Sequence, residues 1–559
     1  MKVNNIQELL NLCDKCIAYG KIEYAEFVIA HIMETWGKNP DVLNDLAKKY
    51  FRMNKKEKAI NIIRRSFDIQ KSVETLNLMA DLNYECKNFE DAAIQYEELT
   101  KHQKDDFIYR RCASSYSNLD LEEEAIRVAK KYVEEKPSAQ SYSTLGHLYI
   151  QVGMVQESLD CCKKAEELFP NSATVNNLKG FTYEAILNDY EGAKKYYIKA
   201  AKQGLNSSYY NLGVCCKHSE DFVNAEKYLK KYIALGPEKD IDYNYTLASI
   251  YMAQRKMKLG YKYYEKRSVI QPFLDLNRRK LWDGKDYPDK TLLVYSEQGL
   301  GDNIQFIRYI PLVAKKFKKV YFATRENLIT LFQQSFPPEE YPNIEIIKEG
   351  DSCRYHKFVM ILDIPNLLHM TYHNIPAKQE YLRCNERTRE LQKINYFQND
   401  DLKIGLCWKA LGMGIRDAVY RTIDAPYYFK SLFDIPDIHF YSFQMGDIFG
   451  MLEKYPQITD LSQEFTDFAQ TAALLKNIDI LITVDTALAH LAGALGVKTY
   501  LLLCKAPDWR WFDNTKKTEW YPSITIIRQK DRRSWDDVAA QLNEYIKKDS
   551  AKFRKSKKK

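Results

Sequence analysis

The chain has 559 residues, too many for one hydrophobic core, so we expect two to four domains. Hydrophobic residues make up 45% of it and charged residues 28%, which excludes an intrinsically disordered protein and one built mainly of membrane spans. The net charge is +8, and segment 547–559 alone holds eight basic residues and one acidic residue. We therefore predict a basic disordered tail at 547–559 and no nucleic-acid partner.

The N-terminal sequence MKVNNIQELLNLCDKC lacks the continuous apolar core of a signal peptide. The longest apolar tract, 478–497, is interrupted by Asp485 and His490, so we expect no transmembrane segment and a cytoplasmic protein. Twelve cysteines without a disulfide framework fit that reducing compartment. Cys13 and Cys16 have CxxC spacing but no second pair, so no metal site is predicted.

The first half of the chain repeats with a period near 34 residues, and its clearest unit is QSYSTLGHLYIQVGMVQESLDCCKKAEELFPNSA. Each unit places Gly or Ala where two helices would cross, an aromatic residue nearby, and in most units a closing proline. This pattern resembles the tetratricopeptide repeat, and we count seven or eight units in a superhelix over 1–275. Stacked helix pairs form a continuous core with a groove, which implies a polypeptide partner.

After the repeats, short aliphatic and β-branched runs alternate with helical stretches, which predicts parallel α/β sheets. The expected strands of the first set are 291–295, 319–324, 344–348 and 358–362, and those of the second set are 404–408, 439–444, 478–484, 498–503 and 524–529. We predict two lobes, 276–395 and 396–546, joined by the polar segment 385–401. Ligands of such sheets bind outside the carboxyl ends of the strands.

The segment SEQGLGDNIQFIRYIPL, 296–312, follows the first of these strands. It is not a P-loop, because no GxxxxGK[ST] run exists in the chain, and a Rossmann fingerprint would need glycine in place of Ile304. A turn at Gly299 and Gly301 leads into a helix with Asp302 in its first turn. Asp302 is either a helix cap or, at the end of a strand that faces a cleft, a general base.

Several motifs in order resemble the heptosyltransferase-like glycosyltransferases of family nine, in the branch fused to tetratricopeptide repeats. The motifs lie at 282–313, 474–503, 506–511 (APDWRW), 520–529 (WYPSITIIRQ) and 535–542 (WDDVAAQL). The resemblance implies an α solenoid followed by an α/β GT-B fold with two Rossmann-like lobes, the first for the acceptor and the second for a nucleotide-sugar donor. It also implies inversion at the anomeric carbon with Asp302 as base, without a metal and without a cofactor other than the nucleotide-sugar co-substrate.

The turn TVDTALAH, 483–490, lies between an expected strand and helix, where backbone N–H groups favour a phosphate. There Asp485, Thr486, Ala487 and His490 are candidate donor-binding residues, although Ala487 replaces a glycine common in the family. The alternative is that Asp485 or Thr486 is a cap and His490 a core histidine. For positive charge near the leaving group we favour Arg421, then Lys409, within CWKALGMGIRDAVYRTI, which departs from the family pattern.

Gln444 ends another expected strand, where the family often reads the nucleotide. Further residues that could line the cleft are Gly299, Gly301, Gln305, Arg416, Asp508, Trp509 and Arg510. For Asp508, Trp509 and Arg510 the alternative is ordinary loop packing around exposed tryptophans.

The leading hypothesis is a cytoplasmic glycosyltransferase that moves a sugar from a nucleotide donor to a hydroxyl of a protein recruited by the repeats. Among bacterial proteins that resemble this architecture, flagellin Ser/Thr residues are the best single candidate acceptors. The alternatives are transfer to a lipopolysaccharide or capsule precursor and a non-catalytic repeat scaffold with a degenerate GT-B domain. The sequence leaves the sugar, the nucleotide and self-association open.

Overall fold

The computed structural model describes residues 5–557 except 54, 237–242, 268–269, 271–273, 275–276, 377–379, 411–420, 424, 447–448, 514 and 533. The chain divides into two compact units, Met1–Leu205 and Asn206–Lys559. We describe each unit by itself.

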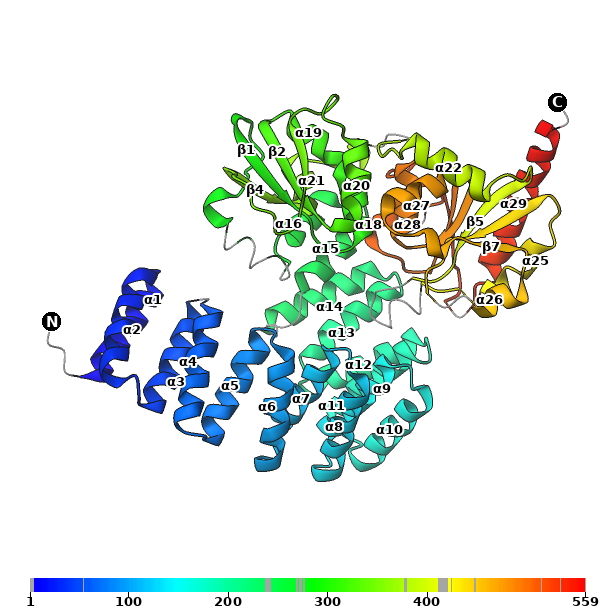
Figure 1. The fold of residues 1–559 in the computed structure, drawn as a ribbon. Coiled ribbons are helices and arrows are strands. Elements are labelled where there is room, and N and C mark those ends of the chain that lie inside the picture. The colour runs from blue at the N-terminus through cyan, green and yellow to red at the C-terminus, as the bar shows by residue number, and fades with distance from the viewer. Residues whose placement is uncertain are drawn as a thin grey trace. The chain divides into compact units, whose positions relative to one another are not determined.

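The first unit consists of antiparallel helix pairs (Figure 1). The helices are α1 (Ile6–Ala18), α2 (Ile22–Trp36), α3 (Pro40–Arg52), α4 (Lys56–Ile69), α5 (Val73–Glu85), α6 (Phe89–His102), α7 (Asp106–Ser117), α8 (Glu122–Glu135), α9 (Ala139–Gln151), α10 (Val155–Leu168), α11 (Ala173–Ala185) and α12 (Tyr190–Lys202). Serine caps begin several of them: Ser72 and Ser138 each accept a backbone N–H three residues along the chain, at 3.0 Å.

Small residues set the close helix crossings in this unit, as the repeat pattern predicts. A Cβ atom at Gly180 would lie 2.6 Å from the ring of Tyr197, and one at Gly146 would lie 2.9 Å from Leu178. Buried tyrosines fill the space between helices and keep a partner for their hydroxyl groups. Tyr96 and Tyr132 donate to Asp81 and Asp106, each at 2.6 Å, which joins neighbouring helices at their polar edge.

The second unit begins with four further helices of the repeat type and continues into two α/β lobes. These helices are α13 (Ser207–His218), α14 (Phe222–Ala234), α15 (Tyr243–Ala253) and α16 (Met257–Tyr264). Helices of the repeat type thus occur in both compact units, which meet at 205/206, and the domain boundary at 275 stays a prediction. Packing explains why the last repeat helices belong to the second unit: Ala248 and Met252 of α15 belong to the same buried apolar cluster as both lobes.

The N-terminal lobe has a parallel sheet of order β3-β2-β1-β4, and the C-terminal lobe has a parallel sheet of order β10-β9-β8-β5-β6-β7. The strands are β1 (Tyr287–Tyr295), β2 (Phe317–Thr324), β3 (Ile344–Lys348), β4 (Lys357–Met360), β5 (Leu402–Cys407), β6 (Ile438–Ser442), β7 (Ile458–Asp460), β8 (Ile480–Val484), β9 (Thr499–Leu503) and β10 (Ile524–Arg528). All nine expected strands are confirmed. The short strand β7, at an edge, was not predicted.

Helices and 3-10 turns cover these sheets (Figure 1). In the N-terminal lobe and the crossover they are η2 (Arg278–Lys280), α18 (Leu300–Phe306), η3 (Ile307–Tyr309), α19 (Ile310–Ala314), α20 (Glu326–Ser335), η4 (Ile361–Asp363), α21 (Ile364–Leu367), η5 (Tyr372–Asn374) and α22 (Glu386–Tyr396). In the C-terminal lobe they are α24 (Ala425–Tyr428), α25 (Lys430–Phe433), α26 (Phe449–Lys454), η6 (Ser462–Glu464), α27 (Phe468–Leu475), α28 (Ala487–Ala494), η7 (Trp509–Trp511) and α29 (Asp536–Lys557). The predicted linker 385–401 is therefore largely the helix α22.

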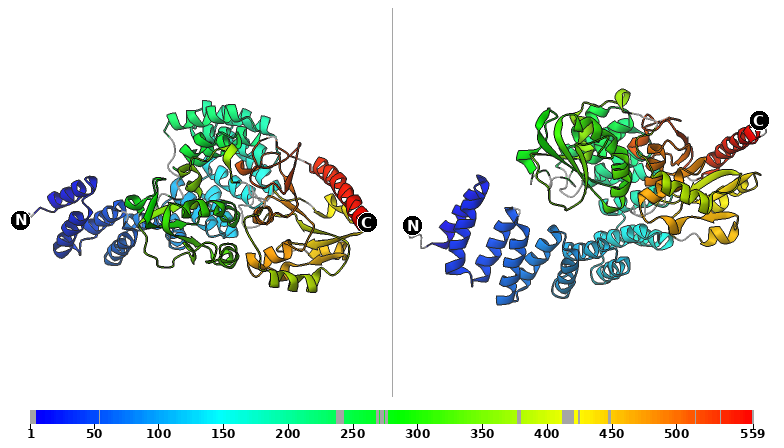
Figure 2. Two further views of the ribbon diagram at one scale, coloured as in Figure 1. Left: turned by 90° about the horizontal axis from the view of Figure 1, so that it is seen from above. Right: turned by 45° about the horizontal axis from the view of Figure 1, so that its top comes forward.

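The prediction of a disordered tail at 547–559 is wrong for the residues that the structure describes. The helix α29 runs to Lys557, and Ile546 and Ser550 on it are buried. Asp549 accepts hydrogen bonds from Lys498 at 2.5 Å and from Tyr500 at 2.6 Å, which fixes this helix to β9. The last turns of this helix carry exposed Lys552 and Lys555, whereas Arg554 pairs with Asp437 at 3.7 Å and Lys557 donates to Asp400 O (Figure 2).

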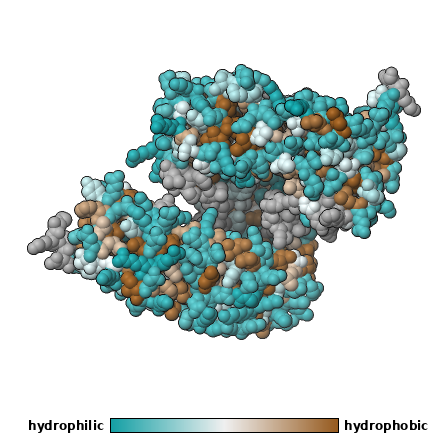
Figure 3. Space-filling model, viewed as in Figure 1, coloured by the Kyte–Doolittle hydropathy of each residue, from teal (hydrophilic) through white to brown (hydrophobic). Residues whose placement is uncertain are grey.

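No helix in the described parts of the chain is both long and apolar enough to cross a membrane. The face shown in Figure 3 is mainly hydrophilic, and its hydrophobic side chains form small separate groups.

Candidate active site

Asp302 lies where β1 ends and α18 begins. Its Oδ2 atom accepts the backbone N–H of Gly299 at 2.8 Å, so it closes the first turn of α18 from the third helical position, whereas Gly299 and not Asp302 is the N-cap residue. Its Oδ1 atom forms an ion pair with Nη2 of Arg510, which belongs to η7 in the other lobe. The carboxylate therefore has one oxygen for the helix start and one that faces the C-terminal lobe.

Arg510 forms ion pairs with two carboxylates, Asp302 and Asp508, which the sequence analysis considered as separate candidates. Its Nη1 atom lies 2.7 Å from Oδ1 of Asp508, while Nη2 contacts Asp302. Burial raises the pKa of Asp302 above its usual value, although the charge of Arg510 opposes that rise. Burial also disfavours ionised Asp508, but Arg510 and Arg421 outweigh this effect and lower its pKa. Asp302 is thus the more basic of the two carboxylates.

Arg421 lies at the turn 483–490, the candidate phosphate site, next to Asp485. The guanidinium Nη1 is 3.1 Å from Asp485 Oδ2, and Asp485 directly follows β8. Burial raises the pKa of Asp485, and the charge of Arg421 acts in the opposite direction. The candidate for positive charge and the candidate phosphate turn are therefore neighbours, although Arg421 and Asp485 are far apart in sequence.

Thr486 precedes α28 and makes no side-chain cap hydrogen bond to it. Its Oγ1 atom lies 3.4 Å from Oγ1 of Thr483 at the end of β8. Thr486 therefore occupies the N-cap position, as the cap alternative predicts, but its side chain does not satisfy the first N–H groups of α28, which keep the character of a helix N-terminus. Ala487 begins this helix.

Gly301 and His490 lie where α18 of the N-terminal lobe packs closely against α28 of the C-terminal lobe. A Cβ atom at Gly301 would lie 2.7 Å from Cδ2 of His490 and 3.3 Å from Cα of Ala487, so α18 and α28 cross without room for a side chain. His490 Nδ1 lies 2.9 Å from the hydroxyl of Tyr521, and its ring stacks on Trp511. Burial lowers the pKa of His490 to about 3, so the ring is neutral. This geometry matches the core-histidine alternative, and a phosphate contact by His490 stays a prediction.

The side-chain amide of Gln444 is hydrogen-bonded to the backbone at the end of β5. Its Oε1 atom accepts the N–H groups of Trp408 and Lys409, at 3.0 and 2.8 Å, and its Nε2 atom donates to Lys409 O at 3.2 Å. The side chain is buried. Gln444 therefore positions the segment that follows β5, and the predicted contact to a nucleotide would have to act through Lys409.

Gln305 is also buried, in α18, and among the described residues its side-chain amide has no hydrogen-bond partner. Trp509 packs edge-on against Tyr264 at 6.1 Å, but the alternative of exposed tryptophans is wrong, because Trp509 and Trp511 are both buried. Arg416 lies outside the described residues. Within those residues, no group of three or more His, Cys, Asp or Glu side chains has the arrangement of a metal site.

Sequence reasoning missed two buried arginines that hold the site in place. Arg308 of η3, directly after α18, donates to Trp520 O at 2.8 Å and to the hydroxyl of Tyr381 at 2.9 Å, and the first of these bonds joins η3 to the C-terminal lobe. Arg267 pairs with Glu297, just before the turn that carries Asp302, and with Asp363 at 2.8 Å. Both pairings join residues far apart in sequence, so no local pattern could reveal them.

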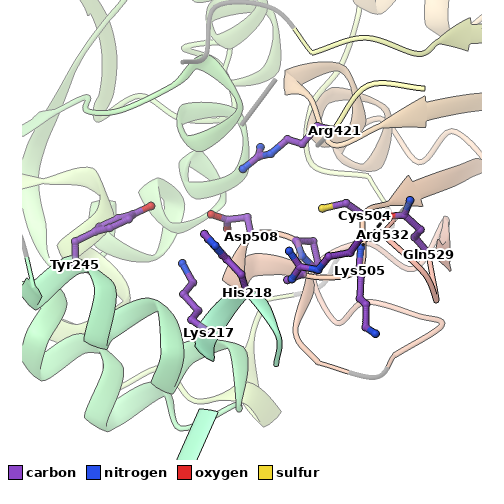
Figure 4. Close-up of a pocket in the computed structure, with 11 residues that line it drawn as sticks. Lys217, His218, Tyr245, Arg421, Cys504, Lys505, Asp508, Gln529 and Arg532 are labelled. Carbon is purple, nitrogen blue, oxygen red and sulfur yellow. Dashed lines mark hydrogen bonds between the residues drawn. The ribbon is translucent and has the colours of Figure 1, made fainter. Parts of the chain in front are cut away.

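Sequence reasoning also missed the residues that the last repeat helices contribute next to the candidate site. Lys217, His218 and Tyr245, from α13 and α15, line a cavity of about 140 Å³ together with Arg421 and Asp508 (Figure 4). The sequence offered no signal for this, because a repeat helix shows its packing positions but not the charged residues that meet another domain.

Comparisons with known proteins agree with this organisation. Residues 458–511, which contain Asp485, His490 and Arg510, match the model of glycosyltransferase family 9 (heptosyltransferase). Residues 139–172 and 207–239 match that of the tetratricopeptide repeat. The chain is similar to protein FlbA of Caulobacter vibrioides, at 25% identity over 341 residues that cover 55% of each chain. It thus spans about half the length of this curated relative.

Two solved structures of tetratricopeptide repeat proteins are similar to part of this chain. A tetratricopeptide protein of Thermus thermophilus, TTC0263, has 20% identity, covers 32% of this chain and 98% of its own, and gives a TM-score of 0.28. One from Parabacteroides merdae has 16% identity, 45% and 98% coverage, and a TM-score of 0.34. The chain therefore carries tetratricopeptide repeats in its N-terminal part and a glycosyltransferase family 9 (heptosyltransferase) domain in its C-terminal part.

Proposed function

We propose that this protein is an inverting glycosyltransferase that moves a sugar from a nucleotide-sugar donor to a hydroxyl group of a protein acceptor. One observation carries the proposal. Asp302 of the N-terminal lobe meets Arg510 of the C-terminal lobe, beside Asp508 and the Arg421–Asp485 pair. The proposed acceptor lobe, 276–395, and donor lobe, 396–546, thus each supply part of one site.

In the proposed reaction, the acceptor oxygen attacks the anomeric carbon from one face of the sugar while the bond to the diphosphate oxygen breaks on the other face. Asp302 accepts the hydroxyl proton as the new bond forms. Burial makes its carboxylate a stronger base than an exposed aspartate, and Arg510 keeps it ionised. Each carboxylate oxygen has a second lone pair, so the cap and ion-pair contacts leave room for the proton.

The leaving diphosphate needs compensation of its negative charge. Arg421 and the N-terminus of α28, with the hydroxyl of Thr486, are the groups that we propose for this role. Lys409 is a second cation, held at the end of β5 by Gln444. We propose that these groups serve without a metal ion.

For the acceptor we propose a polypeptide, bound by the repeats, with flagellin Ser/Thr residues as the first candidate. The support is the combination of repeats with a glycosyltransferase family 9 domain, because stacked repeats typically bind polypeptides. We place the reaction in the cytoplasm, where nucleotide sugars are made. Self-association stays a prediction.

The test is incubation of the protein with flagellin and nucleotide sugars, followed by mass spectrometry of the acceptor. We expect a sugar mass increment that Asp302→Ala abolishes. Asp289→Ala is the matched control, because Asp289 is an exposed aspartate on β1 in the same lobe. An increment of equal size in Asp302→Ala would contradict the proposal.

Two alternatives predict different outcomes. Transfer to a lipopolysaccharide or capsule precursor predicts loss of surface polysaccharide in a deletion strain, with unchanged glycoproteins. The alternative of a non-catalytic scaffold is suggested by segment 407–423, whose sequence differs from the family pattern. It predicts that calorimetry detects no binding of any nucleotide sugar.

A further inference from the structure

The last repeat helices and the C-terminal lobe together enclose a cavity of about 140 Å³ within the second unit. Figure 4 shows Lys217 and His218 extending from α13 toward Asp508, with Tyr245 of α15 at one side. Arg421 reaches toward the same point from the opposite side. The remaining wall comes from the segments that follow β9 and β10, at the carboxyl ends of these strands.

The cavity wall has an excess of positive charge. It contains the cationic side chains of Lys217, Arg421, Lys505 and Arg532, against the single carboxylate of Asp508. That carboxylate already forms an ion pair with Arg510, at 2.7 Å. A concave site lined mainly by one sign of charge, with protein around it, concentrates the field and attracts an anion.

The cavity adjoins the candidate active site through Asp508. Arg510 bridges Asp508 to Asp302, and Arg421 reaches from the cavity wall to Asp485 at the start of α28. An anion in the cavity would therefore lie next to Asp508, which the guanidinium of Arg510 connects to Asp302. A leaving group must lie close to the candidate base in this way if Asp302 takes the proton of the attacking hydroxyl.

The repeat wall is held firmly against the C-terminal lobe. Arg255, just after α15, forms an ion pair with Asp513 and donates to Asp513 O at 2.9 Å, and Asp513 N–H donates to Ala253 O at 3.1 Å. Tyr264 of α16 packs edge-on against Trp509. These contacts fix α15 and α16 to the segment that carries Asp508, and α13, with Lys217 and His218, packs against α15.

We propose that this cavity binds the diphosphate of the donor, and that Lys217 and His218 of the repeat helix α13 are donor-binding residues. The inference rests on the proposed function and deepens it. The volume is a few times that of one water molecule and smaller than the roughly 300–1,000 Å³ of sites that enclose a whole drug-sized ligand. It fits a diphosphate, with the sugar and the nucleoside outside. The repeats then take part in donor binding as well as in recognition of the acceptor.

The test is calorimetry on the full chain with inorganic pyrophosphate and with UDP, ADP and GDP as probes. We expect Lys217→Gln and Arg532→Gln each to weaken binding of pyrophosphate and of the preferred nucleotide about tenfold or more, because each removes a charge-assisted contact. Lys217→Arg keeps the charge and should retain most of the affinity. Lys227→Gln on α14, an exposed lysine of a neighbouring helix, is the matched control and should bind as the unchanged protein does.

The outcomes separate this inference from the proposed function. If Lys217→Gln and Arg532→Gln bind both probes as tightly as the unchanged protein, while sugar transfer is observed, the cavity inference is overturned and the proposed function stands. If pyrophosphate binds in a Lys217-dependent manner but no sugar is transferred, the cavity inference stands and the proposed function fails. If neither pyrophosphate nor any nucleotide binds, both are overturned. Thermal melting of each variant shows that lost binding does not reflect unfolding.

Discussion

The helices before Leu205 and the repeat helices after Asn206 follow one sequence pattern but have different neighbours. In the first unit, repeat helices bury their apolar faces against each other, and hydrogen bonds from tyrosine to aspartate join neighbouring helices at their polar edges. In the second, α15 gives side chains to the core of the α/β lobes, and α13 gives charged residues to a cavity. The repeat pattern therefore identifies a helix pair, whereas its role depends on what the pair contacts.

Two ionic contacts, one from each unit, show a similar difference. In the first unit, pairs such as Lys104–Glu135 lie on the surface, with Lys104 half exposed. In the second, Arg267 is fully buried between Glu297 and Asp363. A buried charge tolerates the loss of its partner far less than an exposed one does, and four predictions test how far this contrast holds.

The largest expected effect follows from Arg267→Met, which leaves Glu297 and Asp363 buried beside each other without a cation. Removal of one partner from a buried ion pair costs about 3–5 kcal/mol of unfolding free energy. Urea denaturation should show this loss in the transition of the second unit. An unchanged midpoint would contradict the structural role of Arg267.

Gly301→Val should disturb the lobe junction next, because its Cβ would overlap the ring of His490. Overpacking of this kind costs about 1–3 kcal/mol, and we expect loss of sugar transfer with it. The matched variant in the first unit is Gly180→Val, which meets Tyr197 instead. It should lower the stability of the first unit and leave the donor affinity unchanged, as thermal melting and calorimetry would show. Equal effects of both variants on donor affinity would contradict the contrast.

These positions also show what could be predicted from sequence. Hydrophobic runs predict the strands of both sheets, and the glycine turn at Gly299 and Gly301 predicts that Asp302 lies at the start of a helix. The pairing of Asp302 with Arg510 could not be foreseen, since it depends on how two lobes meet across 208 residues of sequence. The prediction of a disordered tail rests on its charge alone. The buried residues Val538, Leu542 and Ile546, at four-residue spacing, hold one face of α29 against the lobe, and this helix continues into the basic segment.

Arg510→Gln should change the pH dependence of sugar transfer. Burial raises the pKa of Asp302 and Arg510 lowers it, so removal of the guanidinium raises that pKa further. A base works only when ionised, and activity is lost as pH falls through its pKa. The acid limb of kcat/KM should therefore move to higher pH. Arg279→Gln, an exposed arginine, is the control, and an acid limb that stays in place in Arg510→Gln would contradict the coupling.

The smallest effect is expected from Lys104→Gln in the first unit. The ion pair of Lys104 with Glu135 lies at the surface, and such pairs contribute about 0.2–1 kcal/mol, less at high salt. Thermal melting at low and high salt should differ little between this variant and the unchanged protein. A loss as large as that of Arg267→Met would remove the distinction between the two units.

If Asp302 acts in glycosyl transfer and not only at the helix start, its ionisable carboxylate is needed for the chemical step. A direct measurement compares kcat for transfer and the Kd of the donor in the unchanged protein and in Asp302→Asn, which retains an oxygen for the Gly299 N–H. We expect a similar donor Kd and a kcat lower by a factor of about 10²–10⁴. Transfer by Asp302→Asn at the rate of the unchanged protein would contradict this role of Asp302.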